Sequence, residues 1–519
     1  MKKKLLAMLL SATLACALLA GCGKSDNTIA GTDSKGEGAT LIYGSNDYTR
    51  INPAIDEHGE INLLLFDGLV AHDADNNLVP GLAKSWEFDD DTNTYTFHLN
   101  EGITWHDGEP FTAEDVKFTI EAIMNPDNES EIASNYEDIE EIKVADDTTV
   151  SFTLNDKNVA FLEYMTIGIL PKHLLDGEDM QTSDYFRFPI GTGPYMMKEW
   201  DEGQSITLVK NPNYFKGEPN IATIVFKIVE DDNAKALQLK SGELDLAKVT
   251  PKDAQNFKED TNFNIYDMTT ADYRGIMYNF NNEFWKKNRD IIPAINYAID
   301  RQAMVDSVLL GEGVPAYGPL QRNKYNNDAV EKYDYNLEKS KELIEAAGWT
   351  LGDDGIYEKD GEKLSFTISI MEGDQVRADL AAIASQQLKA VGIDAKGQVQ
   401  SEIDWENQEA FLIGWGSPFD ADDHTYKVFG TDKGSNYNAY SNEEVDKYLT
   451  KARQTEDEDE RMEAYAKFQV ALSQNPAYTF FCYVDVDYIA NKNIKGISEN
   501  TILGHHGVGI FYNVAEWEM

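Results

Sequence analysis

The stretch richest in groups that could hold a ligand runs from Gly414 to Tyr426, with the sequence G-W-G-S-P-F-D-A-D-D-H-T-Y. Its tryptophan lies between two glycines after a short apolar strand predicted over 410–413. Main-chain N–H and C=O groups therefore stay free, and an indole face is available for stacking. Glycine lets another backbone approach closely, and main-chain hydrogen bonds hold a peptide whatever its side chains. We predict that Trp415, Gly416 and Ser417 contact a ligand.

Two arginines outside this loop could bind a carboxylate. Arg274 follows Tyr273, and we count both as candidate ligand contacts; Arg377 stands at the start of a predicted helix. A guanidinium pairs with a carboxylate through two parallel hydrogen bonds. The alternative for each arginine is a salt bridge within this acidic chain. Asp420 is either a ligand contact or a turn residue that makes an Asx hydrogen bond.

Residue types used in catalysis and metal binding occur without a supporting pattern. His106 beside Asp107 is interpreted as a structural pair in a turn, because no second histidine lies at ligand spacing. His505 and His506 are adjacent, so their side chains should point differently, and we predict neither a metal site nor a cofactor. G-x-S-x-G, H-E-x-x-H and G-x-x-x-x-G-K-[ST] are absent. Cys482 is expected to be a buried, inert thiol. We therefore predict no enzyme activity.

The N-terminus has the form of a secretion signal. Three lysines precede an apolar run over 5–19, and Leu19-Ala20-Gly21-Cys22 follows, similar to a bacterial lipobox. We expect cleavage before Cys22 and a lipid on its sulfur; the alternative is an ordinary signal peptide in which Cys22 is incidental. No later run approaches 18 apolar residues, so the rest is expected to be soluble. Since Cys16 leaves with the leader, no intrachain disulfide is expected.

The length and net charge of the chain limit the number of domains and the class of binding partner. The chain has 519 residues, enough for two or three domains with substantial cores. Its formal net charge is −46, which would repel nucleic acid phosphates, so a nucleic acid partner is excluded. The acidity serves either solubility outside the cell or mild steering of cationic ligands.

Local patterns predict both helices and strands. Thr112 and Asp115 form a capping box before a helix, and a long helix is predicted over 291–306. Strand, helix and strand between about 364 and 400 indicate a βαβ unit, and 478–489 is either a strand pair or one long strand.

Several ordered motifs resemble one protein family. They are P-I-G-T-G-P-Y from Pro189, K-N-P-N-Y-F-K-G-E-P up to Pro219, W-H-D-G-E-P-F-T-A-E-D-V-K-F from Trp105, and S-G-E-L-D from Ser241. The chain resembles the substrate-binding proteins of ABC importers in the peptide/nickel class, solute-binding family 5, over roughly 40–515. A helix of the type R-x-A-I-x-x-A-I-D-R lacks its first arginine here, since Ile292 and Pro293 stand at its place.

The resemblance implies a two-lobed periplasmic-binding-protein-like α/β fold with an extra α+β subdomain, in which a ligand is enclosed between the lobes by closure about a hinge. The expected division is signal peptide 1–21, tether 22–39, first lobe 40–66, 191–284 and 496–519, inserted α+β domain 67–190, and second lobe 285–495.

The resemblance also implies a function. We expect a monomeric lipoprotein, anchored through Cys22 to the outer face of the cell membrane, that captures peptides and delivers them to an ABC permease. Family members that bind peptides commonly place an aspartate, the partner of the ligand ammonium, where Pro418 stands. That departure favours nickel chelates or another small solute as the alternative. Asp420, Asp422 or Asp423 could replace the missing carboxylate. An extracellular hydrolase or adhesin is the alternative from another class.

Overall fold

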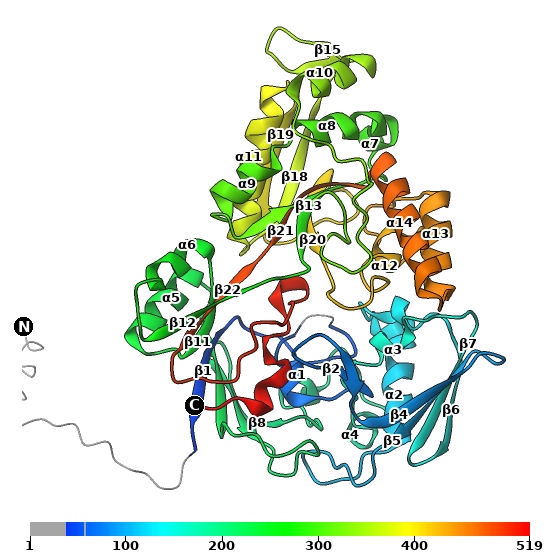
Figure 1. Ribbon diagram of the computed structural model, residues 1–519, viewed down its shortest axis with the longest axis vertical. Coiled ribbons are helices and arrows are strands. Elements are labelled where there is room, and N and C mark those ends of the chain that lie inside the picture. The colour runs from blue at the N-terminus through cyan, green and yellow to red at the C-terminus, as the bar shows by residue number, and fades with distance from the viewer. Residues whose placement is uncertain (1–37, 57–58) are drawn as a thin grey trace, which may run out of the picture. The chain divides into compact units, whose positions relative to one another are not determined.

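Two large β-sheets organise the part of the chain that the computed structural model describes, residues 38–56 and 59–519 (Figure 1). The predicted signal peptide, Cys22 and nearly all of the tether lie outside these residues. Gly38–Met519 form one compact unit. No helix within the described residues is both long and apolar enough to cross a membrane.

The first large sheet has seven strands in the order β12-β22-β11-β1-β10-β9-β8. Helices α5 (Asp232–Ser241) and α6 (Pro251–Ala254) follow two of its strands, and the short α1 (Asn62–Leu65) follows β1. The strand bounds are β12 (Phe263–Met268), β22 (Val486–Asn491), β11 (Leu246–Val249), β1 (Thr40–Ser45), β10 (Thr223–Ile228), β9 (Ser205–Lys210) and β8 (Tyr195–Asp201).

The second large sheet has six strands in the order β14-β21-β13-β20-β18-β19. Figure 1 shows α9 and α11 on one side of it and α12, α13 and α14 on the other. Its strands are β14 (Gly313–Pro315), β21 (Tyr478–Val484), β13 (Tyr273–Tyr278), β20 (Ala410–Trp415), β18 (Ser365–Met371) and β19 (Asp394–Gln400). Its helices are α7 (Glu283–Lys287), α8 (Ile292–Ala298), α9 (Arg301–Val308), α10 (Leu337–Ala346), α11 (Gln375–Ala390), α12 (Tyr426–Phe429), α13 (Glu443–Gln454) and α14 (Glu458–Gln474).

The predicted βαβ unit is confirmed. Strands β18 and β19 are parallel, and α11 connects them. A minor three-stranded sheet, β15 (Thr350–Leu351), β16 (Tyr357–Lys359) and β17 (Glu362–Lys363), precedes β18.

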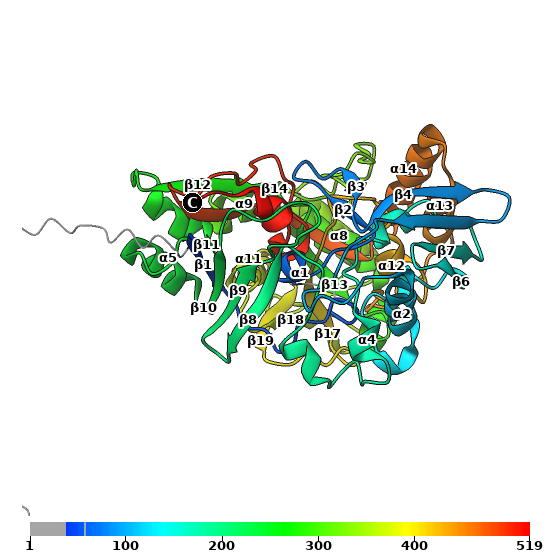
Figure 2. The ribbon, with the colours of Figure 1, turned by 90° about the horizontal axis from the view of Figure 1, so that it is seen from below.

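A four-stranded antiparallel sheet in the order β4-β5-β7-β6 forms the inserted α+β part. Figure 2 shows it at the opposite end of the molecule from α5. The predicted capping box begins its main helix, since the Thr112 main-chain N–H donates to Asp115 Oδ2 at 2.9 Å. Elements of this part are β2 (Val70–His72), β3 (Leu78–Pro80), β4 (Ala83–Asp89), β5 (Thr94–Leu99), α2 (Ala113–Met124), β6 (Ile139–Asp146), β7 (Thr149–Leu154), α3 (Phe161–Tyr164) and α4 (Lys172–Leu175).

The chain crosses between the two large sheets at two places. One crossing joins β12 to β13 through residues 269–272, and the other joins β21 to β22 at Asp485. The buried apolar residues separate at the same places, because one core cluster includes Met268 and Tyr488 and the other runs from Tyr273 to Val484. The predicted lobe boundaries at 285 and 495 stay predictions, but sheet membership favours boundaries at the two crossings.

The predicted helix over 291–306 is wrong in one respect, because it is two helices, α8 and α9. Ile299 has an extended backbone, and the Asp300 side chain accepts the main-chain N–H of Ala303 at 3.0 Å. An aspartate at this position caps a new helix, which competes with continuation of the old one. The segment 478–489 holds two successive strands, β21 and most of β22, which lie in different sheets and do not pair with each other.

The loop 189–195 joins the insert to the first large sheet and fits against α1. A Cβ at Gly191 would lie 1.7 Å from the carbonyl oxygen of Leu65, so only glycine fits. His106 binds both glycines of the loop: its Nδ1 accepts the N–H of Gly191 at 3.1 Å, and its Nε2 is 3.0 Å from the carbonyl oxygen of Gly193. Burial lowers the pKa of His106 to about 4, so the ring is neutral and Nε2 carries the proton. His106 is structural, as predicted, although Asp107 pairs with His173 instead.

Candidate ligand site

Trp415 ends β20 at the crossing between the sheets and is the centre of an aromatic cluster. Its side chain is 5% exposed. The rings of His424 and His505 lie 5.2 and 5.3 Å from it between centroids, and the His505 ring is stacked at 29°. Tyr437 is 6.1 Å away on a further side. The structure thus brings two imidazoles to the indole that the sequence singled out.

The glycines around Trp415 make room for the protein itself. A Cβ at Gly416 would lie 2.0 Å from the carbonyl oxygen of Ala271, in the first crossing. A Cβ at Gly414 would lie 2.3 Å from Nη1 of Arg274. The close approach predicted for a ligand backbone is therefore made by the chain's own crossing segment and by Arg274. The main-chain N–H of Gly416 donates to Nδ1 of His424 at 3.1 Å.

The loop carboxylates are bound from within the protein. Arg461 donates to both oxygens of Asp420 at 2.6 Å, and Arg453 donates to Asp422 Oδ2 at 2.6 Å. Asp420 Oδ1 also accepts the N–H of Asp422, which is the predicted Asx turn. Ser417 Oγ accepts the N–H of Phe419 at 3.3 Å. Asp420 and Asp422 therefore already have buried cationic partners.

A buried carboxylate links the first crossing to the aromatic cluster. Asp272 is 1% exposed. Its Oδ1 accepts a hydrogen bond from Nη1 of Arg274 at 2.5 Å and lies 2.9 Å from Nδ1 of His505. Its Oδ2 accepts the main-chain N–H of His506 at 3.1 Å. Burial acts to raise the pKa of Asp272, but Arg274 and His505 outweigh it and hold that pKa well below its usual range. The crossing positions His505, because Ala271 and Leu503 are joined by a main-chain hydrogen bond of 2.9 Å.

The guanidinium groups of Arg274 and Arg377 lie beside Asp272 at one cavity. Arg377, in the first turn of α11, is buried, and burial together with the nearby Arg274 lowers its pKa to about 10. Its Nε is 3.1 Å from Asp374 Oδ2. Arg274 Nε makes no hydrogen bond to any described residue. Both arginines line a cavity of about 530 Å³ between the two large sheets, together with Asp272 and His506.

A second cavity of about 540 Å³ borders loop 414–426. Phe419 from the loop and Tyr512 from the C-terminal segment line it. The buried Asp67 also borders it, holding hydrogen bonds from Thr192 and Tyr214.

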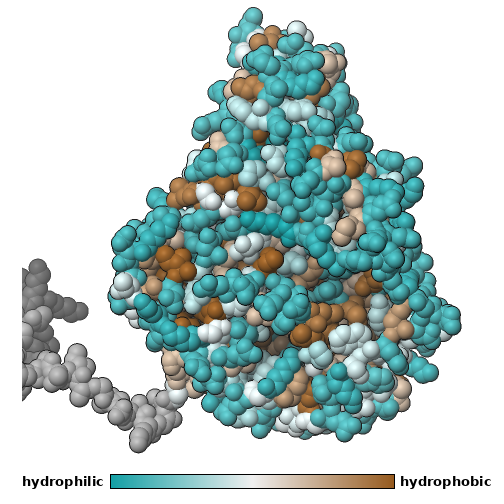
Figure 3. Space-filling model, in the orientation of Figure 1, coloured by the Kyte–Doolittle hydropathy of each residue, from teal (hydrophilic) through white to brown (hydrophobic). Residues whose placement is uncertain are grey.

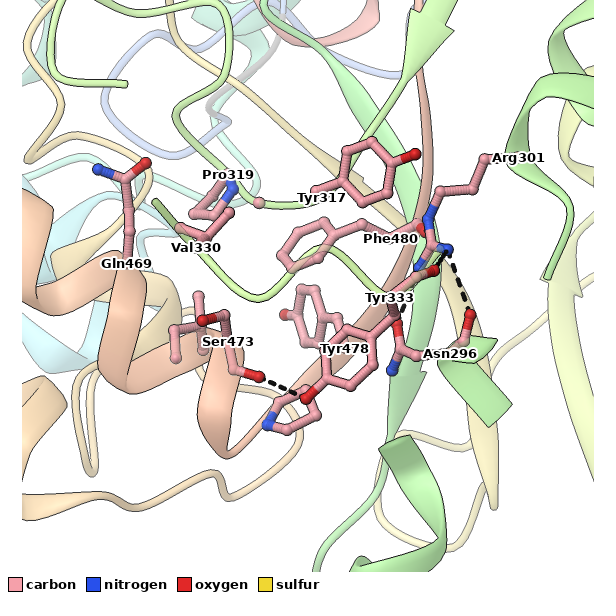
Figure 4. A pocket seen from close by; sticks show the side chains of 13 residues that line it. Asn296, Arg301, Tyr317, Pro319, Val330, Tyr333, Gln469, Ser473, Tyr478 and Phe480 are labelled. Atoms are coloured by element: carbon pink, nitrogen blue, oxygen red, sulfur yellow. Dashed lines mark hydrogen bonds between the residues drawn. The ribbon is translucent and has the colours of Figure 1, made fainter. Parts of the chain in front are cut away.

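A third cavity is too small to hold a solute. It measures about 10 Å³ and is bordered by Arg301, Tyr317, Tyr333 and Phe480 (Figure 4). It holds at most one water molecule, so its polar groups serve the fold.

Among the described residues, no group of three or more His, Cys, Asp or Glu side chains is arranged to hold a metal ion. The Cys482 thiol is fully buried, and burial raises its pKa to about 12, as expected for an inert thiol.

Sequence reasoning missed three members of this cluster, His424, His505 and Asp272. Adjacent histidines point differently, so the pattern at 505–506 does not by itself predict a site. The signal that could have recovered His505 is the pairing of 503–506 with the crossing at 269–272, which no local pattern encodes. The predicted ligand roles of Trp415, Gly416, Ser417, Asp420, Tyr273, Arg274 and Arg377 stay predictions. The structure pairs Tyr273 with Trp415 across two strands and places Arg274 and Arg377 at one cavity.

Comparison with known proteins assigns the family. Residues 77–437 match the bacterial extracellular solute-binding proteins, family 5 Middle. The oligopeptide-binding protein AppA of Bacillus subtilis is 30% identical over 99% of both chains. The chain belongs to the bacterial extracellular solute-binding proteins of family 5.

Solved structures of this family share the fold. The crystal structure of NikZ from Campylobacter jejuni in complex with Ni(L-His) matches with a TM-score of 0.87 and 37% identity, over 93% of this chain and 99% of that one. AppA of Bacillus subtilis in complex with a nonapeptide matches with a TM-score of 0.85 and 29% identity, over 93% and 99%. The predicted family, the two-lobed α/β fold and the peptide/nickel class of ABC transport are confirmed.

Proposed function

We propose that this family 5 protein captures an amino-acid chelate of nickel, of the nickel–histidine type, and presents it to an ABC permease. The observation that carries the proposal is the His505 imidazole, stacked on Trp415 with its Nδ1 held by Asp272. A carboxylate that accepts the N–H of one ring nitrogen fixes the orientation of the ring, an arrangement typical of histidines that bind metals, and the next residue, His506, borders the cavity of about 530 Å³.

The absence of a larger donor cluster among the described residues favours a chelate over a bare ion. One imidazole cannot fill the coordination of a transition metal, so the remaining nitrogen and oxygen donors would come from the bound amino acid. Its carboxylate would be held by Arg377 and Arg274, which border the adjoining cavity. The likeness to NikZ, crystallised with Ni(L-His), supports the same ligand class.

A peptide is the second candidate, favoured by the relation to AppA over nearly the whole chain. The two cavities, of about 530 and 540 Å³, could hold a short extended chain. The geometry favours it less, because Asp420 and Asp422 are already paired with arginines and an ammonium would find them neutralised.

Calorimetry separates the two candidates. The protein freed of metal by a chelator would be titrated with nickel plus L-histidine, with nickel alone, and with a mixture of short peptides. We expect heat with nickel–histidine that is lost in His505→Ala and kept in His98→Ala, a partly exposed histidine on β5 of the insert. Binding of peptides with no response to nickel–histidine would select the second candidate.

We further propose that the protein carries no catalytic activity, acts as a monomer and is anchored by lipid at Cys22 on the outer face of the membrane. The basic start, the apolar run and the L-A-G-C ending support the anchor. Cys22→Ser is expected to move the protein from the membrane fraction to the medium. Retention of this variant on the membrane would show that the lipid is not the anchor.

A further inference from the structure

The ligand loop 414–426 is contacted across the cleft by the inserted domain. Asp422, in this loop, is 1% exposed and accepts the hydroxyl of Tyr164 at 2.5 Å on Oδ2. Tyr164 ends α3 of the insert, and its carbonyl oxygen accepts the hydroxyl of Tyr136 at 2.6 Å. A residue of the inserted domain therefore binds directly to the segment that carries Trp415 and His424.

Arg453 on α13 binds Asp422 of the loop and two residues of the insert, Asp138 and Val159. Its Nη2 donates to Asp422 at 2.6 Å within its own lobe, and its Nη1 donates to Asp138 Oδ2 of the insert at 3.0 Å. Its carbonyl oxygen accepts the main-chain N–H of Val159 at 2.9 Å, and its guanidinium lies 3.4 Å from the Tyr426 ring centroid. Burial opposes the charge of Arg453, but Asp422 outweighs it and raises the pKa of the guanidinium.

Opening of the cleft would break some of these contacts and keep others, because the four residues belong to two different parts of the protein. Arg453 and Asp422 would stay together, because both belong to the second lobe, whereas Asp138 and Tyr164 would separate from them. Separation would leave the half-buried carboxylate of Asp138 and the buried hydroxyl of Tyr164 without these partners. Other pairs across this boundary, such as Lys433 with Glu137, are more exposed, and exposed pairs contribute little.

We infer that Tyr164 and Asp138 form a closure latch on Arg453 and Asp422, which holds the inserted domain against the second lobe and positions the ligand loop. The latch exists only while the cleft is closed, so it raises the population of the closed form and slows release of a bound solute. His72 adds a second contact to the same loop, since its ring stacks on Phe419 at 3.4 Å between centroids.

The test uses the near-isosteric variants Tyr164→Phe and Asp138→Asn, alone and combined, with Glu137→Gln as the neighbouring control. Small-angle scattering of the ligand-free protein measures the radius of gyration, which reports on closure and does not depend on the proposed ligand. We expect a larger radius of gyration for the combined variant than for the wild type, and no change for Glu137→Gln.

Stopped-flow release of nickel–L-histidine, the probe of the proposed function, supplies the second reading. We expect the combined variant to release the probe about tenfold faster, which corresponds to about 1.4 kcal/mol of lost closure. If the probe does not bind the wild type, the scattering result still decides the latch. Unchanged scattering, with or without a lower melting temperature, would overturn it and make these residues ordinary supports of the fold.

Discussion

Arg301 shows how a single buried charge can serve architecture. It is 4% exposed, and its hydrogen bonds to described residues go to carbonyl and amide oxygens. Nε donates to Ala316 and Phe480 at 3.0 and 2.8 Å, and Nη2 donates to the Asn296 side chain at 2.9 Å (Figure 4). Burial lowers its pKa to about 10. The planar fork joins β21 to the start of α9.

Arg301→Lys should therefore destabilise the second lobe. One ammonium cannot reach the oxygens that five guanidinium N–H groups serve, so buried acceptors lose their partners. We expect a loss of about 3 kcal/mol in the free energy of unfolding, measured with urea. Arg187→Lys, at an exposed pair with Glu202, is the matched control. Equal midpoints for the two variants would contradict this account.

The raised pKa of Asp487 leads to a prediction of how the free energy of unfolding depends on pH. Asp487 lies in β22 between Val249 and Asp267, is 2% exposed, and burial together with Glu312 raises its pKa to about 9. The unfolded chain has a pKa of about 4 at this residue, so the folded state binds the extra proton. Its contribution to stability is present below about pH 4 and is lost as pH rises toward 9.

Asp487→Asn keeps a hydrogen-bond donor toward Glu312 and removes the titration. Its free energy of unfolding should rise relative to the wild type between pH 5 and pH 9, by on the order of 1 kcal/mol per pH unit at most. Urea unfolding at pH 5, 7 and 9 measures this, with the exposed Asp91→Asn as control. A difference between Asp487→Asn and the wild type that does not vary with pH would mean that Asp487 is already ionised.

At the scale of elements, local sequence patterns located most segments. The capping box at Thr112, the βαβ unit around α11 and the buried Cys482 follow from patterns within one segment, and the structure contains all three. The break between α8 and α9 was missed because apolar periodicity continues through it, while a single aspartate starts a new helix.

The candidate site was harder to predict, because its members come from distant segments. Trp415 was found from its own glycine-rich loop. Its neighbour His505 depends on the pairing of 503–506 with the crossing, and the partner of Asp420 is Arg461 on α14. Such pairings depend on tertiary contacts, whose partners a single sequence does not mark.

The loop that joins the insert to the first large sheet gives an element-scale prediction. Gly191→Ala places a methyl group 1.7 Å from the Leu65 carbonyl oxygen, so the loop and α1 must move apart. We expect a loss of about 3 kcal/mol, the upper end for overpacking, measured by thermal unfolding. Gly318→Ala is the control, because a Cβ there meets nothing within 4 Å. Comparable melting temperatures for both variants would refute the packing argument.

At the scale of the whole molecule, the charge of −46 is the dominant property. The face in Figure 3 is mostly hydrophilic, with hydrophobic residues in small separate patches. Like charges spread over a folded surface repel and destabilise the compact state. The repulsion is long-ranged at low salt, since the Debye length is about 30 Å at 0.01 M and about 8 Å at 0.15 M.

Added salt should therefore stabilise this protein. Surface repulsion is screened strongly, whereas the buried pairs of Arg453 with Asp422 and Arg461 with Asp420 are screened little. We expect the melting temperature to rise by several degrees between 0.01 and 0.15 M sodium chloride and to change little above that, where the screening length is already short. Matched measurements in sucrose, which is uncharged, control for general solvent effects. A melting temperature that falls with salt would mean that attractive ion pairs outweigh the excess of negative charge.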